Sequence, residues 1–268
     1  MPGSVIAETT IPGQILQFTE DDHRYVLKDK KTGEELKQLT SSTTLIDKYF
    51  PEFKSNEISL RSACRALGVD PNLPPSPIVE AKAAEIRAEW KGAADYGTRV
   101  HEYMEDLMRG RKPRNTPETE KERIVFELGA GFVKKVKPKL ENIMPERIVC
   151  DPYYAVSGCI DLLAKDPHTD QLIIMDWKTN KSISTYSEEY AYPPISHFMN
   201  CKLSHYILQL NLYEFILKHA GYIPEHIKVL KYLVHLHQTK GVTVIPIADH
   251  FNDIVAILED FKSKQEMA

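Results

Sequence analysis

The chain has few cysteines and no long apolar run. No segment of its 268 residues approaches the roughly 18–20 apolar residues that a membrane-spanning helix needs. Its first residues are neither a hydrophobic signal nor an arginine-rich transit segment. No two cysteines form a C-x-x-C pair, so the pattern indicates free thiols in a reducing compartment. We therefore expect a cytoplasmic or otherwise intracellular protein with no membrane partner, not a secreted one. The four cysteines are Cys64, Cys150, Cys159 and Cys201.

A strong excess of positive charge is also absent. The net charge is −4 and the isoelectric point is near 6.2, which argues against a protein that coats nucleic acid indiscriminately. An enzyme acting on nucleic acid is still compatible with this charge, because local fields matter more than the total. Basic residues gather at 109–114 and at 134–139. Phosphate contacts and solvated helix ends both remain open for these two groups.

Two apolar segments, residues 154–165 and 172–178, are separated by turn residues. The first is rich in apolar and β-branched residues, and the second ends in Asp-Trp-Lys. Between them, residues 166–170 read Asp-Pro-His-Thr-Asp, a composition typical of a tight connection. The pattern predicts a β-hairpin.

The register of this hairpin determines which side chains meet. If residue 166 pairs with residue 171, Asp161 lies opposite Asp176, and Lys178 shares a face with Asp176 because side chains alternate along a strand. A bulge would shift this register. Opposed carboxylates repel one another, whereas Mg²⁺ takes oxygen ligands of this kind. The hairpin thus predicts a cation site beside Lys178, and the alternative is a solvated Asp–Lys pair on the surface.

Two flanking segments predict amphipathic helices that carry further polar side chains. Residues 96–110 have an apolar stripe with Thr98 as a candidate N-cap, and residues 204–220 form the second helix. Residues one turn apart are neighbours on a helix surface. Two such pairs are His101 with Glu105, and Gln209 with Tyr213.

Four short motifs occur in order along the chain. They are G-x-x-x-H at 97–101, G-x-x-D at 158–161, D-x-K at 176–178 and Q-x-x-x-Y at 209–213. Together they resemble the RecB-type exonuclease branch of the PD-(D/E)xK nuclease superfamily. The resemblance covers roughly residues 40–215 and is closest to mitochondrial genome maintenance exonucleases and related phage or viral exonucleases. The additional residues that carry this closer similarity are Ser42, Thr44, Leu45, Ile46 and Trp90.

The resemblance implies a role for each matched residue. The ligands of one or two Mg²⁺ or Mn²⁺ ions would be His101, Asp161, Asp176 and the backbone carbonyl of Trp177. The catalytic residues would be Asp161, Asp176, Lys178, Gln209 and Tyr213. Lys178 would align or activate a water, and Gln209 and Tyr213 would position the scissile strand or the lysine. Glu105 is expected at the helix surface or behind the ligands rather than among them.

Some positions depart from the family pattern. Gly-Cys-Ile-Asp lacks the proline of the superfamily name, which is usual in this branch, and the second acid is Asp176 rather than glutamate. Its side chain is one methylene shorter, which would alter metal spacing without abolishing binding. Glu146 is expected to open the strand before the hairpin, where related enzymes often carry a glutamate, so a site role and a structural role both stay open. Several RecB-type nucleases hold an iron–sulfur cluster through C-terminal cysteines, but nothing after Cys201 is cysteine, so we expect no such cluster.

The pattern of elements predicts an α/β (α+β) fold in a single nuclease domain, 1–268. The resemblance implies a restriction-endonuclease-like core, with a central mixed β-sheet flanked by helices. We expect an N-terminal hairpin and helical subregion (1–95), a catalytic core (96–220) and a closing hairpin and helix (221–268). The first hairpin would span 14–39 and turn at residues 31–33, and the closing strands would be 227–237 and 241–247. The expected helices are 43–50, 56–67, 78–92, 96–110, 117–138, 204–220 and 250–263.

Residues 182–203 form a long segment between Lys178 and the helix of Gln209. The segment could be a flap whose aromatic side chains stack on the bases of a single strand. A packed surface loop is the equal alternative. Its aromatic residues are Tyr186, Tyr190, Tyr192 and Phe198, which surround two prolines.

These features together predict a Mg²⁺- or Mn²⁺-dependent deoxyribonuclease. We expect an exonuclease that hydrolyses phosphodiester bonds from DNA ends or single strands and leaves 5′-phosphates, in recombination, repair or genome processing. A phage or viral genome is a source that fits the resemblance. The alternatives are a structure-specific or restriction-type endonuclease and a catalytically inactive nucleic-acid-binding protein. RNA as substrate, the polarity of digestion and the oligomeric state stay open at this stage.

Overall fold

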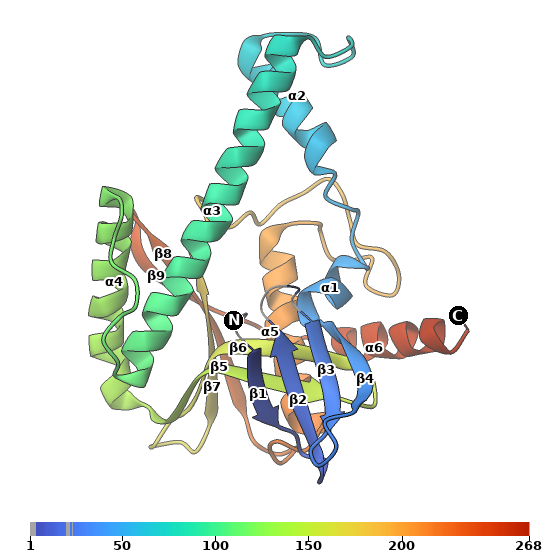
Figure 1. Ribbon diagram of the computed structural model, residues 1–268, viewed down its shortest axis with the longest axis vertical. Coiled ribbons are helices and arrows are strands. Elements are labelled where there is room, and N and C mark those ends of the chain that lie inside the picture. Colours follow the sequence, from blue (N-terminus) through green and yellow to red (C-terminus); the bar gives the residue numbers. More distant parts are fainter. Residues whose placement is uncertain (1–3, 20–21, 23, 268) are drawn as a thin grey trace.

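The computed structural model describes residues 4–19, 22 and 24–267. Within these residues, nine strands form one mixed sheet with helices around it, which confirms the predicted fold class (Figure 1). The strands are β1 (Ser4–Glu8), β2 (Gln14–Thr19), β3 (Arg24–Asp29), β4 (Glu35–Ser41), β5 (Glu141–Asp151), β6 (Val156–Lys165), β7 (Leu172–Lys178), β8 (Val229–His237) and β9 (Gly241–Pro246). The helices are α1 (Ser42–Asp47), α2 (Ser55–Leu67), α3 (Pro77–Arg109), α4 (Glu120–Val136), α5 (Lys202–His219) and α6 (Phe251–Glu266), with a short 3₁₀ turn at Lys137–Lys139.

Strand β6 is the branch point of the sheet. Strand β5 pairs with it antiparallel along one edge, while β4 and β7 share the other edge. Strand β4 pairs in parallel with the first two residues of β6, and β7 pairs antiparallel from Leu162 to Lys165. Residues 158–161 lie between these two partners, where the described chain places no strand against that edge. The sheet therefore opens at Asp161, and side chains can approach it from outside the ladder.

The N-terminal part of the chain differs from the predicted hairpin. The turn at residues 31–33 is confirmed, and Gly33 there has φ +73°. The long first arm of the expected hairpin is instead two strands, β2 and β3, and β1 adds a further strand to the antiparallel meander. A long arm facing only β4 would leave much of its backbone unpaired, and the meander satisfies those groups.

The predicted helices 78–92 and 96–110 are wrong as two elements, because α3 is continuous through both. Thr98 is not an N-cap: its Oγ1 donates to the carbonyl of Ala94, 3.3 Å away, as a mid-helix threonine does. Gly92 weakens a helix by about 1 kcal/mol relative to alanine but does not end it. The true ends are Pro77 in the first turn and Gly110, which has φ +71°.

The two halves of α3 have different surroundings. Its N-terminal half packs on α2, and the pair projects from the body as a helical arm (Figure 1). Its C-terminal half packs with α4 over one face of the sheet, above a cluster that includes Trp177. Helices α1, α5 and α6 cover the larger core cluster on the other side. Helix α3 thus forms part of the arm with its N-terminal half and covers one face of the sheet with its C-terminal half.

The remaining elements follow the expected order. The predicted helices at 43–50, 56–67, 117–138, 204–220 and 250–263 are confirmed as α1, α2, α4, α5 and α6, with ends shifted by a few residues. The closing strands are confirmed as β8 and β9. Every described helix is too short or too polar to cross a bilayer.

Candidate metal and active centre

The hairpin of β6 and β7 has the predicted register. Asp166 N donates to Gln171 O at 2.9 Å, and the ladder runs from there to Leu162 opposite Met175. Regular pairing stops at this point. Beyond it, Trp177 N donates to the side chain of Asp161, with 2.8 Å between N and Oδ2. Asp161 therefore replaces a backbone acceptor where the two strands separate.

Asp176 and Lys178 form a buried ion pair. The distance from Lys178 Nζ to Asp176 Oδ2 is 2.6 Å, and the exposed fractions of the two side chains are 15% and 3%. The ammonium of Lys178 therefore neutralises this buried oxygen at hydrogen-bonding distance. The ammonium also lies over the ring of Tyr206, 4.5 Å from its centroid.

His101 enters the centre from α3. Its Nδ1 lies 3.3 Å from Asp161 Oδ2, and about a third of its side chain is exposed. The predicted ligands His101, Asp161 and Asp176 are thus brought to one place, although they come from residues far apart in the sequence. The backbone of Trp177 borders the same place, while its side chain is fully buried below α3 and α4. Its carbonyl as a ligand stays a prediction.

Glu146 joins this group, which the sequence left undecided. It lies in the middle of β5 rather than opening the strand, and its φ is +51°. The pairs Pro145–Leu162 and Arg147–Ile160 flank it, so it faces Asp161 across the β5–β6 ladder. The ligand atoms of His101, Glu146 and Asp161 all lie within 4.8 Å of one another. These three residues form a group that could hold a metal ion.

Burial and neighbouring charges shift the pKa values of the residues in the centre. Burial lowers the pKa of His101, but the Asp161 carboxylate outweighs it and raises that pKa to about 9. Burial raises the pKa of Asp176 to about 6 against the opposing ammonium of Lys178, and burial with the Asp161 charge raises the pKa of Glu146 to about 7. Burial also acts to raise the pKa of Asp161, yet His101 holds it below its usual value. Burial lowers the pKa of Lys178, and Asp176 more than compensates, so it stays above its usual value.

Gln209 and Tyr213 are hydrogen-bonded to each other on α5. Gln209 Nε2 donates to Tyr213 Oη at 2.8 Å, and Tyr213 is buried in the core cluster of α1 and α5. Among the described residues, Tyr206 of the same helix contacts Lys178, and neither Gln209 nor Tyr213 does so. No motif singled out Tyr206, although it lies three residues before Gln209 and so on the same helix face. The predicted positioning roles of Gln209 and Tyr213 stay predictions.

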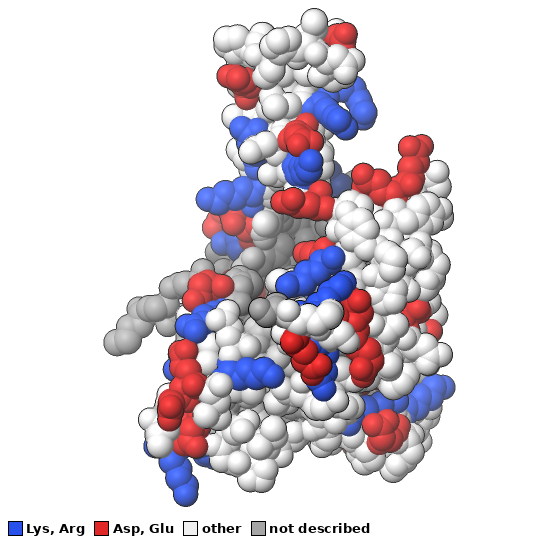
Figure 2. Space-filling model, turned by 90° about the vertical axis from the view of Figure 1, so that its right-hand side faces the viewer, with Lys and Arg blue, Asp and Glu red and all other residues white. Residues whose placement is uncertain are grey.

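The centre has a hollow on each side. A cavity of about 830 Å³ is lined by His101, Glu146 and Cys159. A larger groove of about 1130 Å³ runs between the α1–α2 connection and residues 184–202, and Tyr206 lies at its wall. On the face shown in Figure 2, acidic and basic side chains alternate around the base of the arm, without one large area of either sign. This face therefore offers no extended basic area for a phosphate backbone.

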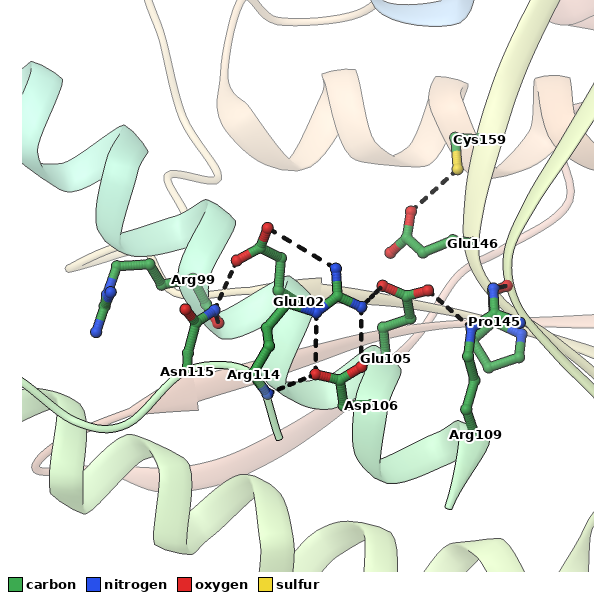
Figure 3. Close-up of polar contacts among 10 residues, drawn as sticks. All are labelled: Arg99, Glu102, Glu105, Asp106, Arg109, Arg114, Asn115, Pro145, Glu146 and Cys159. Carbon is green, nitrogen blue, oxygen red and sulfur yellow. Dashed lines mark hydrogen bonds and ion pairs between the residues drawn. The ribbon is translucent and has the colours of Figure 1, made fainter. Parts of the chain in front are cut away.

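Two of the four basic residues at 109–114 are paired with neighbouring acids (Figure 3). Arg109 donates to Glu105 at 2.7 Å and to the carbonyl of Pro145 at 2.8 Å. Arg114 binds Asp106 through two nitrogens and also Glu105. Arg109 therefore links α3 to β5, and Arg114 links α3 to the loop that follows it. Both guanidinium groups are engaged in these contacts.

Comparison with known proteins gives little further information. No protein-family model matches the chain, and no curated protein matches it. The crystal structure of SSO0001 is 13% identical over 88% of this chain and 80% of its own, with a TM-score of 0.37. The crystal structure of a protein named "Putative exonuclease" from Eubacterium rectale is 9% identical over 64% of this chain and 65% of its own, with a TM-score of 0.38. Similarities this low do not support a function for the chain.

Proposed function

We propose that this chain is a divalent-metal-dependent nuclease that hydrolyses phosphodiester bonds, and more finely a DNA exonuclease acting at ends. The observation that supports it most is the convergence of His101, Glu146 and Asp161, whose ligand atoms lie within 4.8 Å of one another, beside the buried ion pair of Asp176 and Lys178. Carboxylates crowded in this way destabilise a hairpin unless a cation or proton neutralises them. Such a cation would acidify an attacking water and neutralise charge on a phosphate oxygen.

The other side chains of the centre have separate roles in this proposal. Lys178 is held protonated by Asp176, so its ammonium acts as a donor that orients the attacking water or stabilises charge on the phosphate, rather than as the base. Tyr206 covers the other side of this ammonium and limits its movement. The Asp161 carboxylate accepts a hydrogen bond from the backbone N–H of Trp177, which keeps Asp161 close to Asp176. Gln209 and Tyr213, which are hydrogen-bonded to each other on α5, position the scissile strand or the lysine in this proposal.

The preference for DNA ends over internal sites and the 5′-phosphate product are what the resemblance of the four motifs to RecB-type exonucleases implies. Duplex, single-stranded and circular DNA distinguish the possibilities directly. We would follow end-labelled linear single-stranded DNA, linear duplex and closed circular DNA over time, each with Mg²⁺, with Mn²⁺ and with EDTA. We expect metal-dependent shortening of linear DNA, with circles left intact.

The matched variants are Lys178→Ala and Lys181→Ala. Both remove one lysine, but Lys178 is buried beside Asp176 and Lys181 is exposed three residues later. We expect Lys178→Ala to abolish cleavage and Lys181→Ala to retain it. Full cleavage by Lys178→Ala in a preparation free of other nucleases would refute the proposed centre.

Two alternative functions give different results in the same experiment. Nicked circles would identify a structure-specific or restriction-type endonuclease. Tight DNA binding without cleavage under any metal condition would identify a nucleic-acid-binding protein that has lost catalysis. Cleavage of an RNA strand but not its DNA equivalent would move the substrate to RNA.

A further inference from the structure

The cavity of about 830 Å³ beside the centre has a lining of three kinds. One part is His101 and Glu146, two of the three residues whose ligand atoms converge. A second part is charged and comes from α3 and the loop that follows it, and a third is apolar and comes from the N-terminal meander and β5. The volume lies within the roughly 300–1,000 Å³ of small-molecule sites. The cavity therefore has the size and the mixed lining of a ligand site.

The apolar part contains a stacked pair of aromatic rings. Phe18 of β2 and Tyr25 of β3 have their ring centroids 4.5 Å apart, with 28° between the ring planes. Tyr25 and Ile148 also belong to the core cluster that packs the meander on β5, so this part of the lining is fixed relative to Glu146, two residues before Ile148. Aromatic side chains are surfaces on which the planar bases of nucleic acids stack.

The charged part contains one arginine that no acid engages. Arg109 and Arg114 are paired with Glu105 and Asp106. The guanidinium of Arg111 lines the same cavity and makes no hydrogen bond or ion pair with any described residue. An arginine in this state is suited to bind a phosphate.

The total charge of the lining also favours an anion once a cation is bound. Three arginines and three glutamates line the cavity and balance one another, so a divalent cation held by His101 and Glu146 makes the total positive. The glutamates are Glu102, Glu105 and Glu146.

We propose that this cavity binds a nucleoside monophosphate, with the phosphate between the metal-binding group and Arg111 and the base against Phe18 and Tyr25. In the proposed nuclease this ligand is the terminal nucleotide of the strand or the nucleotide just released. That role rests on the proposed function, whereas the binding of a nucleoside monophosphate does not.

The probe is 2′-deoxyadenosine 5′-monophosphate in the presence of Mg²⁺. Calorimetry should detect its binding, and saturation-transfer NMR should show the strongest transfer to the adenine protons, because the base lies on the aromatic rings. Deoxyadenosine, which lacks the phosphate, should bind at least about tenfold more weakly. No binding of the monophosphate, or equal affinity for both compounds, would overturn the site.

Two exposed residues test the two parts of the lining. Arg111→Gln should weaken binding of the monophosphate by about tenfold or more. The matched control is Lys112→Gln, which removes an exposed charge from the next residue, outside the cavity lining.

The second variant fills the cavity. Val5 of β1 lines it and is 42% exposed, so Val5→Trp should abolish binding. The control is Val244→Trp on β9, where the valine is 45% exposed and far from this lining in the sequence. Wild-type affinity in both Arg111→Gln and Val5→Trp would contradict the proposal.

Competition separates the two sources of the nucleotide. In Lys178→Ala, a single-stranded oligonucleotide should displace the monophosphate if the cavity takes the end of a strand. A monophosphate that stays bound beside the oligonucleotide would support a site for the released nucleotide instead.

The site and the nuclease fail separately. Binding of the monophosphate that depends on Arg111 and Val5, in a protein that cleaves no nucleic acid, would leave the nucleotide site and remove the nuclease. Metal-dependent cleavage without any binding of the monophosphate would leave the nuclease and remove the nucleotide site.

Discussion

Gly158 lies directly against the ring of Tyr213. A Cβ atom at position 158 would fall 2.4 Å from Tyr213 Cε1 and 3.1 Å from Ser42 Oγ, much closer than atoms approach without bonding. The glycine of G-x-x-D and the tyrosine of Q-x-x-x-Y are therefore the two sides of one contact. This contact fixes α5 against β6, three residues before Asp161.

Replacing this glycine should destabilise the fold through steric overlap. We expect Gly158→Ala to lower the free energy of unfolding by about 1–3 kcal/mol, because the Tyr213 ring is fully enclosed and cannot move aside. Chemical denaturation measures the loss. The control is Gly131→Ala on α4, which has open space around its Cβ position and should stabilise the helix slightly. In a double-mutant cycle, Tyr213→Leu should reduce the cost of Gly158→Ala, and simple additivity would refute the contact as the cause.

Metal affinity should rise with pH. A cation must displace the protons that His101 carries below a pKa of about 9, Glu146 below about 7 and Asp176 below about 6. The affinity for Mn²⁺ should therefore increase from pH 6 toward pH 9, by up to about tenfold per pH unit for each proton displaced. Isothermal titration in buffers of different ionisation enthalpy measures both the affinity and the proton release.

A variant of the histidine isolates its part in this pH dependence. His101→Asn removes the group with the highest pKa, so the increase in affinity between pH 7 and pH 9 should largely disappear. An affinity that is constant or falls with rising pH in the wild-type protein would contradict these charge assignments.

Arg109 should act on the metal centre through the backbone of β5. It ties α3 to the carbonyl of Pro145, one residue before Glu146, and so sets the separation between the histidine and the glutamate. We expect Arg109→Gln to weaken Mn²⁺ binding by about 10–100-fold, as the loss of an orienting contact does, with the helix content unchanged. Titration calorimetry and circular dichroism measure the two effects. Arg123→Gln, which breaks exposed ion pairs on α4, is the control and should bind Mn²⁺ normally.

The exposed tyrosines of residues 182–203 should bind single strands without affecting the metal. Tyr186, Tyr190 and Tyr192 are 67%, 48% and 51% exposed, whereas Phe198 is buried and cannot stack on a base. Replacing all three tyrosines with alanine should weaken single-strand binding by about 1–3 kcal/mol for each base they stack on. Fluorescence anisotropy with a labelled oligonucleotide, beside Mn²⁺ titration, measures both properties. Equal strand affinity in the triple variant would identify the segment as a packed surface loop, and Tyr153→Ala is the control for an exposed tyrosine elsewhere.

The sequence predicts local relationships well and long-range ones only in part. The short loop between β6 and β7 determined the register of Asp161 and Asp176, because a tight turn leaves little freedom in pairing. His101 could be placed in the centre only by the resemblance of its motif, since nothing local ties α3 to the hairpin. Glu146 stayed undecided because its position depends on the β5–β6 ladder, which the sequence around it does not determine.

The contacts that the sequence did not predict also depend on packing between elements far apart in the chain. Tyr206 belongs to none of the four motifs, and only the approach of α5 to β7 places it over Lys178. The break expected before Thr98 relied on cap propensity, which is weak beside the packing of α3 against α4 and the sheet. The sequence left phosphate contacts and solvated helix ends open for Arg109 and Arg114, because their ion pairs with Glu105 and Asp106 depend on how the side chains of α3 and the following loop meet.

The continuity of α3 couples the arm mechanically to the candidate centre. A helix of 33 residues is about 50 Å long, and the structure describes all of it without an internal proline or break. A load applied near Pro77 is transmitted to His101 through unbroken backbone hydrogen bonds, with the packing on α4 and the sheet as fulcrum. A partner that binds the tip of the arm therefore exerts a force on His101.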